Sequence, residues 1–414
     1  MAGRRKNGEG SWGTKTINGI KYKFYKDVNG KYFYGKTNTE INAKKEDYYN
    51  KHKDAKEHKK KKSIIDQQKE VKLKTFGEGI LEWLNTEKST NIKKTTFDGY
   101  EDCINGQIIN YKGHRLADKQ IGALDLETIN DYYASLSNIY TSGTIKKNYA
   151  IVSQYIEYCN DNNFFDENIN IDKIKLPKEN DVAKKRREIN FLSEEDVKLF
   201  CKEAKRINVP GFCFGKLGEP TYGNNAYILM FIVVTGLRIG EAMALQWNDV
   251  NKNDKFIIIR KTSVTIKNRG QGQDDHSPKH ITSTQSTKTR AGERIVPLNK
   301  TALEIIAYEE SLNPNHQSTD YVFINKNGEQ IKSRQNINRT LKNIMSRAGC
   351  SVNNLTPHEL RHTFGSLLIE KGVDIKVVSE LLGHKDIKMT YNIYIHVLEK
   401  QKAKAITVLD KINI

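Results

Sequence analysis

The chain has 414 residues and a formal net charge of +18, from 68 lysines and arginines against 50 aspartates and glutamates. This length fits two or three domains, and the positive excess favours a polyanionic partner, of which nucleic acid is the commonest. No apolar run approaches the ~20 residues of a membrane span, no secretory signal is predicted, and the five scattered cysteines form no CxxC pair. We therefore expect a protein of a reducing cytoplasm, without a membrane segment and without structural zinc.

The first 50 residues predict a small β unit. Apolar or aromatic residues alternate with basic ones over 20–25 and 31–36, and Asn29-Gly30 between these segments is a hairpin signal. A helix is expected over 37–53. Such a sheet could lie in a DNA groove, or its aromatic residues could simply form the core of the hairpin, and the segment does not decide between the two. The residues that would contact DNA are Lys21, Lys23, Tyr32, Tyr34 and Lys36.

A lysine-rich run follows at 56–62. Such runs are typical of solvated, flexible linkers, and they can also touch phosphates without sequence preference. We expect a domain boundary between this run and about residue 72.

The segment from 73 to about 175 predicts a helical bundle. Three apolar stripes recur at helical spacing and are expected to form its core. They comprise Phe76, Ile80, Trp83 and Leu84; Leu124, Leu126, Ile129, Tyr132, Tyr133 and Leu136; and Ile145, Tyr149, Val152, Tyr155, Ile156 and Cys159. Lysines on the polar faces would let the bundle clamp DNA: Lys93, Lys94, Lys146 and Lys147. A polar, basic stretch at 178–189 predicts an interdomain linker.

A third domain is expected from about residue 190. Ser193 is a natural N-cap, the wholly apolar run 228–234 predicts a buried helix that Gly236 ends, and 256–259 predicts a strand. Residues 261–298 predict strands around a long polar loop, and helices fill the rest up to about residue 400. The segment 405–409 could be a short strand or a packing peptide.

The stretch 355–362, Leu-Thr-Pro-His-Glu-Leu-Arg-His, has a strong helix-start signal. Thr356 suits the N-cap, Pro357 suits the first helical position, and Glu359 completes a capping box. His358 and Arg361 then share one face at an end of the helix that attracts anions. Taken alone, the octapeptide favours a capped helix with two solvated side chains.

Four more segments place basic, titratable or phenolic residues beside glycines and helix boundaries. They contain Arg238 in Thr-Gly-Leu-Arg-Ile-Gly-Glu, Lys288 in Thr-Lys-Thr, His384 in Leu-Gly-His, and Tyr394 in Tyr-Ile-His-Val. Together with His-Glu-Leu-Arg-His at 358–362, their order and spacing resemble the tyrosine recombinases of the phage and conjugative-element integrase group. The motifs cover roughly the last half of the chain, and the β unit and the helical middle resemble that family's arm-binding and core-binding domains by pattern and position.

The resemblance implies a multidomain, mainly α fold with small antiparallel sheets. An N-terminal β-sheet DNA-binding unit with its basic linker would occupy 1–62, a helical core-binding domain 72–178, and an α+β catalytic domain with a C-terminal tail 190–414.

The resemblance also implies a chemistry that needs neither metal nor another cofactor. Tyr394 would attack a DNA phosphodiester to form a 3′-phosphotyrosine and release a 5′-hydroxyl. Arg238 and Arg361 would meet the charge on the phosphoryl oxygens. Lys288 would protonate the leaving oxygen and His358 would act as acid or base. The remaining assignments are His384, a hydrogen-bond donor to phosphate, and Glu241, which orients an arginine or nearby backbone.

Several of these assignments have rivals. Lys279 and Arg290 are alternatives to Lys288 as the general acid. Tyr391 is the alternative nucleophile, but the Ile-His-Val that follows Tyr394 favours Tyr394. Glu241 could be a plain helix residue, and His384 could merely cap a helix. A zinc pair of His276 and His280 is rejected because Pro278 would break the helix between them.

The implied partner is double-stranded DNA, at core and arm sites. A homotetramer would exchange strands through a Holliday junction, integrating and excising a mobile element in the bacterial cytoplasm, close to the nucleoid. An excisionase or DNA-bending proteins would be accessory partners, and residues 401–414 would pack on a neighbouring protomer. The alternatives are a DNA-relaxing enzyme of the type IB topoisomerase kind and a non-catalytic DNA-binding protein of the same fold. Two segments, 210–225 and 263–281, are long for a minimal member, and the second is either an extra hairpin or a loop.

Overall fold

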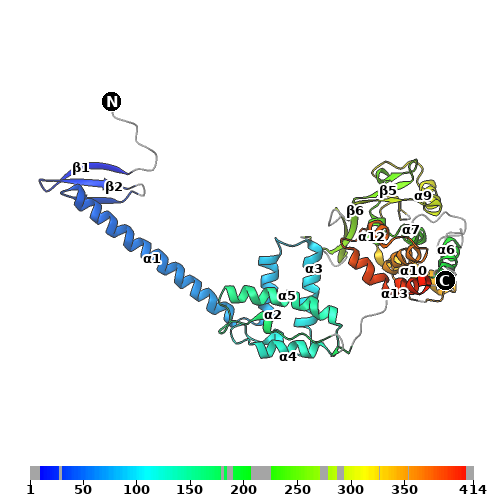
Figure 1. Ribbon diagram of the computed structural model, residues 1–414. Helices are drawn as coiled ribbons and strands as arrows, with labels where there is room; N and C mark the ends of the chain where they lie inside the picture. Colours follow the sequence, from blue (N-terminus) through cyan, green and yellow to red (C-terminus); the bar gives the residue numbers. More distant parts are fainter. Residues whose placement is uncertain are drawn as a thin grey trace. The chain divides into compact units, whose positions relative to one another are not determined.

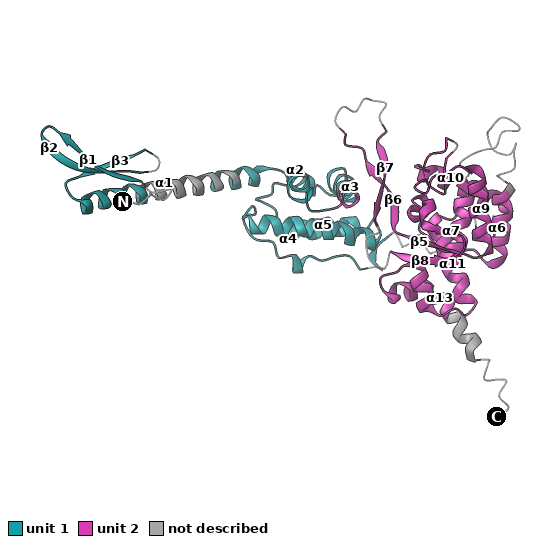
Figure 2. Ribbon diagram, turned by 90° about the horizontal axis from the view of Figure 1, so that it is seen from above, with its two compact units in different colours: residues 1–92, 99–186 teal, residues 93–98, 187–414 magenta. Residues whose placement is uncertain are grey.

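The computed structural model describes residues 10–27, 30–178, 181–183, 190–206, 225–270, 278–286, 293–325, 327–352 and 354–406. Contacts divide the chain into two compact units, an N-terminal unit (1–92 and 99–186) and a C-terminal unit (93–98 and 187–414) (Figure 2). Among the described residues, no helix combines the length and the apolar character that crossing a bilayer requires.

The N-terminal unit begins with a three-stranded antiparallel sheet in the order β1 (Ser11–Ile17), β2 (Ile20–Lys26) and β3 (Tyr32–Gly35). The sequence analysis predicted β2 and β3 but missed β1. The signal for β1 was the Asn18-Gly19 pair, whose two positive φ values, 48° and 72°, are those of a tight hairpin turn. The one turn expected in this unit, Asn29-Gly30, falls partly outside the described residues.

Helix α1 (Asn38–Leu73) begins at a side-chain cap on Thr37 and packs its first turns on the sheet (Figure 1). Phe33 and Ile41 are buried, and the Phe33 ring lies 5.4 Å from that of Tyr48. The helix does not stop near residue 53 as expected, so the lysine run 56–62 lies inside it rather than in an irregular linker. The segment contains no glycine or proline, and its lysine, glutamate and glutamine residues are good helix formers.

The rest of the N-terminal unit is the predicted helical bundle. Its elements are α2 (Phe76–Trp83), η1 (Leu84–Lys88), the second half of α3 (Lys94–Cys103), η2 (Ile104–Ile109), η3 (Leu116–Asp118), α4 (Leu126–Leu136), α5 (Ser142–Asp161) and η4 (Ile171–Lys173). The first half of α3, up to Asp98, is assigned to the C-terminal unit. A capping box between Thr75 and Glu78 starts α2. Most residues of the three apolar stripes are buried, which confirms them as core, and Tyr132, Tyr133 and Tyr155 are at most 1% exposed.

The C-terminal unit is built around the apolar run that the sequence predicted to be a buried helix, now α7 (Asn225–Thr235). The other helices are α6 (Glu194–Arg206), α8 (Ile239–Met243), η6 (Trp247–Asp249), α9 (Lys300–Leu312), α10 (Arg334–Ala348), α11 (Pro357–Glu370), α12 (Ile375–Leu382) and α13 (Ile387–Ile406). Helices α6, α9, α10 and α11 all contact α7. Because α7 is apolar on every side, it must be surrounded.

Two small sheets complete this unit. One has the order β4 (Val250–Asn251), β5 (Phe256–Ile259) and β8 (Arg294–Pro297), and the other is the hairpin of β6 (Lys261–Lys267) and β7 (His280–Ser286). The described ends of the stretch 263–281 therefore belong to the two paired strands of a hairpin, with Ile266 opposite Ile281, and residues 271–277 lie outside the described residues. The segment 210–224 lies outside the described residues.

Candidate functional site

Helix α11 starts as its sequence predicts. The Thr356 hydroxyl accepts from the Glu359 backbone N–H at 3.4 Å, the Glu359 carboxylate accepts from the Thr356 N–H at 2.7 Å, and Pro357 occupies the first turn. This reciprocal cap fixes the direction of the first turns, which carry His358 and Arg361.

Arg361 is not a solvated side chain. It is fully buried, and its guanidinium donates to the Gly236 carbonyl at 2.9 Å and to the Leu382 carbonyl. Burial and the nearby charge of Arg238 lower its pKa to about 9, so Arg361 stays protonated at neutral pH. The α11 start, the turn after α7 and the end of α12 therefore meet at one cation.

Arg238 follows the sharp turn at Gly236, whose φ of +69° disfavours any residue with a side chain. Its guanidinium donates to Glu241 at 2.8 Å and to the Gly383 carbonyl at 3.2 Å, and its side chain remains 38% exposed. Glu241 also accepts from the Arg238 backbone N–H at 2.9 Å. Glu241 thus accepts hydrogen bonds from both the guanidinium and the backbone of Arg238.

Glu241 is 3% exposed, and burial alone would raise the pKa of its carboxyl group. Hydrogen bonds and charge from Arg294, followed by the charges of Arg238 and Arg361, lower the pKa to about 2 instead. The carboxylate therefore stays ionised beside three arginines.

His384 follows Gly383, which ends α12 with a φ of +63°. The imidazole Nδ1 lies 2.7 Å from the buried Thr390 hydroxyl. Burial and the charges of Arg361 and Arg238 lower the pKa of His384 to about 3, so the ring is neutral near pH 7. If Thr390 donates to Nδ1, Nε2 carries the proton and is available as a donor.

Tyr394 lies on α13 with its side chain fully buried. Its hydroxyl is 3.4 Å from Nδ1 of His362, and a Cβ at Gly365 would overlap that hydroxyl. Burial raises the pKa of Tyr394, against a smaller opposing effect of Arg361, so the phenol keeps its proton at neutral pH. The rival, Tyr391, is 41% exposed on the same helix.

His358 is exposed at the start of α11, and its ring meets the buried ring of His362 edge to face at 4.5 Å. Burial, followed by the nearby His358 and Arg361, lowers the pKa of His362 to about 4. Near pH 7, His362 can thus accept a hydrogen bond from Tyr394.

The predicted general acid cannot be placed in this cluster. Lys288 and its rival Arg290 lie outside the described residues, and Lys279 is exposed just before β7. His276 is also outside them, and the described residues contain no cluster of three or more side chains able to hold a metal ion.

The predicted DNA-contacting residues of the sheet lie on two faces. Residues opposite each other in antiparallel strands share a face, so Tyr32 and Tyr34 lie with Lys26 and Phe24. Lys21 and Lys23 lie on the face of Phe33, which packs on α1. Of the other predicted contacts, Lys36, Lys93, Lys94, Lys146 and Lys147 are all exposed.

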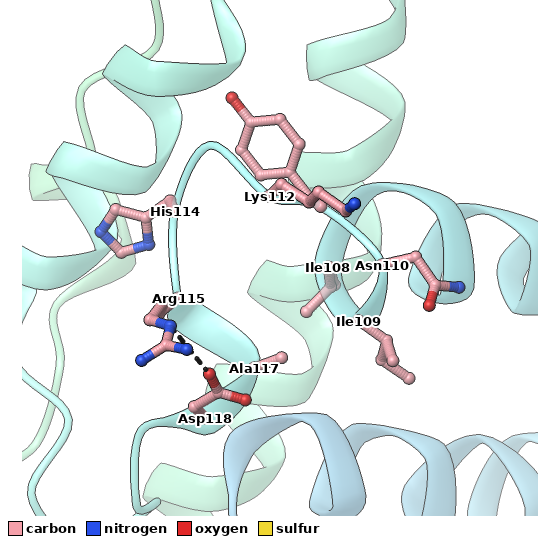
Figure 3. Close-up of a pocket in the computed structure, with 9 residues that line it drawn as sticks. Ile108, Ile109, Asn110, Lys112, His114, Arg115, Ala117 and Asp118 are labelled. Carbon is pink, nitrogen blue, oxygen red and sulfur yellow. Dashed lines mark ion pairs between the residues drawn. The ribbon is translucent and has the colours of Figure 1, made fainter.

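A separate pocket of about 420 Å³ opens in the N-terminal unit after η2 (Figure 3). Tyr111, Lys112 and His114 help to line it, and an exposed ion pair joins Arg115 to Asp118 at 3.5 Å. None of the residues predicted to carry chemistry or to contact DNA lies in this pocket.

Sequence reasoning missed two residues of the cluster. Arg294 binds Glu241, and His362 contacts Tyr394. For His362 the signal was its position one helical turn after His358. For Arg294 the sequence offered only its place at the start of a predicted strand.

Known phage integrases and tyrosine recombinases are similar to this chain. Residues 190–401 match the model of the phage integrase family. The "Tyrosine recombinase XerC-like" protein of Caldanaerobacter subterraneus subsp. tengcongensis is 30% identical over 408 residues, covering 94% of each chain. The "Integrase" of Staphylococcus phage L54a is 28% identical and covers 83% of this chain and 94% of its own.

Two solved structures share the fold. The Tn1549 transposon integrase, solved with a circular intermediate DNA, gives a TM-score of 0.60 at 17% identity and covers 80% of this chain and 99% of its own. A lambda integrase dimer bound to a core site gives a TM-score of 0.53 at 16% identity, and the match covers 95% of this chain and 96% of the lambda integrase chain. The fold and the arginine, histidine and tyrosine cluster define a tyrosine-type site-specific recombinase. The chain belongs to the phage integrase family.

Proposed function

We propose that this recombinase integrates and excises a mobile element by cutting and rejoining double-stranded DNA with Tyr394 as its nucleophile. The observation that carries the proposal is the convergence of Arg238, Arg361 and His384 on the end of α12, in the unit whose last helix holds Tyr394. DNA bound to the Tn1549 and lambda integrases supports the choice of substrate.

In the proposed reaction, the Tyr394 hydroxyl gives its proton to Nδ1 of His362, 3.4 Å away, as its oxygen attacks the scissile phosphorus and the bond from phosphorus to the 5′-oxygen breaks. The strand ends as a 3′-phosphotyrosine, and the 5′-oxygen takes a proton from Lys288. Arg238 and Arg361 bind the non-bridging oxygens, because permanently charged planar forks match phosphate geometry. Neutral His384 donates through Nε2, and His358 exchanges protons with solvent at the exposed edge.

The proposed organisation has three parts. Residues 1–62 bind arm sites and residues 72–178 bind the core site, with Lys93, Lys94, Lys146 and Lys147 on phosphates. Residues 190–414 carry out the chemistry. Four copies exchange strands through a Holliday junction, and the tail 401–414 packs on a neighbouring copy. An excisionase or DNA-bending proteins act as accessory partners, and the protein works in the bacterial cytoplasm at the nucleoid.

A covalent trap tests the assignment of the nucleophile. Nicked duplexes with randomised sequence around the nick lose a short fragment on cleavage, so the phosphotyrosine cannot be resealed and accumulates. We expect the wild type and Tyr391→Phe to trap DNA, and Tyr394→Phe to trap none. A wild type that forms no covalent complex would refute the proposed chemistry, and trapping by Tyr394→Phe but not by Tyr391→Phe would move the nucleophile to Tyr391.

A further inference from the structure

Three consecutive carbonyls end α12, and each accepts a hydrogen bond from a different arginine. Arg294 Nε donates to Leu381 at 2.7 Å, Arg361 donates to Leu382, and Arg238 donates to Gly383 at 3.2 Å. The last carbonyls of a helix have no partners within it and form the negative end of its dipole, so cations suit this position. Arg238 and Arg361 have a role in the proposed reaction, but Arg294 does not.

Arg294 is the arginine most tightly engaged with Glu241. Its two terminal nitrogens face the two carboxylate oxygens, at 2.9 and 3.2 Å, and its side chain is only 7% exposed. Arg238 reaches the same carboxylate through one guanidinium nitrogen and stays 38% exposed. Arg361 is 4.0 Å away. A two-pronged, buried pair is the stronger and more directional arrangement.

This difference has a consequence for phosphate binding. A buried carboxylate without a partner is costly, so Glu241 must keep a cation close by. Because Arg294 supplies that cation permanently, Arg238 can turn its fork from Glu241 to an incoming phosphate without leaving the carboxylate uncompensated. Without Arg294, Glu241 would depend on the guanidinium of Arg238 for its direct ion pair. Phosphate would then have to compete with Glu241 for Arg238.

We propose that Arg294 is a positioning residue for strand cleavage, which holds Glu241 so that Arg238 is free to bind the scissile phosphate. The inference rests on the function proposed above for Arg238. It adds a residue that touches neither DNA nor the nucleophile and acts through Glu241.

The test is a double-mutant cycle on the trapping rate of the full-length protein, with a nicked duplex recovered from the randomised library. The variants are Arg294→Met, Glu241→Gln and the double substitution. We expect Arg294→Met to slow trapping about 100-fold, the typical cost of losing one preorganised donor to the transition state. Glu241→Gln in that background removes the charge that captures Arg238 while keeping an acceptor for its backbone N–H. We therefore expect the double variant to recover at least tenfold.

Arg347→Met is the matched control. Arg347 also pairs with a buried glutamate, Glu203 at 3.4 Å, and donates to a backbone carbonyl, that of Asn343 at 3.0 Å. We expect its loss to lower the melting temperature without slowing trapping. If Arg294 had only a structural role, the double variant would trap DNA no faster than Arg294→Met, and that result would overturn the inference. Trapping by Arg294→Met at the wild-type rate would also overturn it.

If Arg294→Met does not fold, Arg294→Lys replaces it, since lysine keeps the charge but lacks the fork. We expect a smaller loss of trapping rate for Arg294→Lys, and adding Glu241→Gln must restore part of that rate for the inference to stand. The failure of the underlying function looks different, because then the wild type itself traps no DNA.

Discussion

The recombinase centre and the DNA-contact candidates of the N-terminal unit are built in opposite ways. Arg361 and Tyr394 are fully buried, and each has a partner on another segment of the C-terminal unit. Lys146 and Lys147 project from α5 into solvent over a core that does not need them. Substitutions at the centre should therefore change chemistry and folding together, whereas substitutions of these two exposed lysines should change DNA affinity with little effect on folding.

The largest effect should come from Gly365→Ala. A methyl group there overlaps the Tyr394 hydroxyl, so the phenol must leave its pocket or the helices must separate. We expect trapping to fall about 100-fold or more, as for other misplaced reacting groups, and stability to fall by about 1–3 kcal/mol. The measurements are the trapping rate and urea unfolding.

Gly143→Ala is the control for that change. Gly143 also lies in a helix, α5, but a Cβ there would meet nothing within 4 Å. We expect it to raise stability by up to about 1 kcal/mol and to leave trapping unchanged. Wild-type trapping by Gly365→Ala would mean that the buried position of Tyr394 has no bearing on cleavage.

A smaller effect is expected from pH. The folded-state pKa of His362 is about 4, below the ordinary 6.5, so the imidazole is neutral in both states above pH 6.5. Between pH 6.5 and 4 the unfolded chain binds a proton that the folded chain does not, so stability falls by up to about 1.4 kcal/mol per pH unit. His384, with a pKa of about 3, acts in the same direction.

Urea unfolding at pH 7 and pH 5 would measure this loss. His362→Gln removes one of the titrating groups, so the variant should lose less stability than the wild type over the same interval. An equal loss in both proteins would contradict the assigned shift. Glu241 contributes little between pH 7 and pH 5, because the stabilisation from its pKa shift, from 4.5 to about 2, is lost only as the pH falls below about 5.

The smallest effect on folding should come from the double substitution Lys146→Ala and Lys147→Ala. Both side chains are exposed, so stability should change by no more than about 0.5 kcal/mol per site. Binding to a nonspecific duplex should weaken, and the slope of log affinity against log salt should fall by about 0.9 for each phosphate that these lysines neutralise. An unchanged slope would show that these two lysines do not contact DNA phosphates.

Much of the fold could be predicted because its signals are local. The cap at Thr356, the helix ends at Gly236 and Gly383, and the apolar run of α7 each depend on a few neighbouring residues. These boundaries also orient the arginines and His384. A short motif therefore indicated both a helix end and a residue of the cluster.

The missed features depend on partners far away in the chain. Arg294 gains its role from Glu241, 53 residues earlier, and His362 from Tyr394, 32 residues later. No spacing rule joins such pairs before the fold is known. The length of α1 was missed for another reason, since a lysine run is compatible with a flexible linker and equally with a helix.

The end of α12 also sets how the three arginines are spread in space. Successive residues of a helix are turned by about 100°, so three neighbouring carbonyls, which all point roughly along the axis, lie at three positions around it. Arginines from β8, α11 and the start of α8 therefore bind the end of α12 at different positions around its axis. Gly383 and His384 lead from α12 to α13, the helix that carries Tyr394. We therefore expect a displacement of α13 to move all three arginines together.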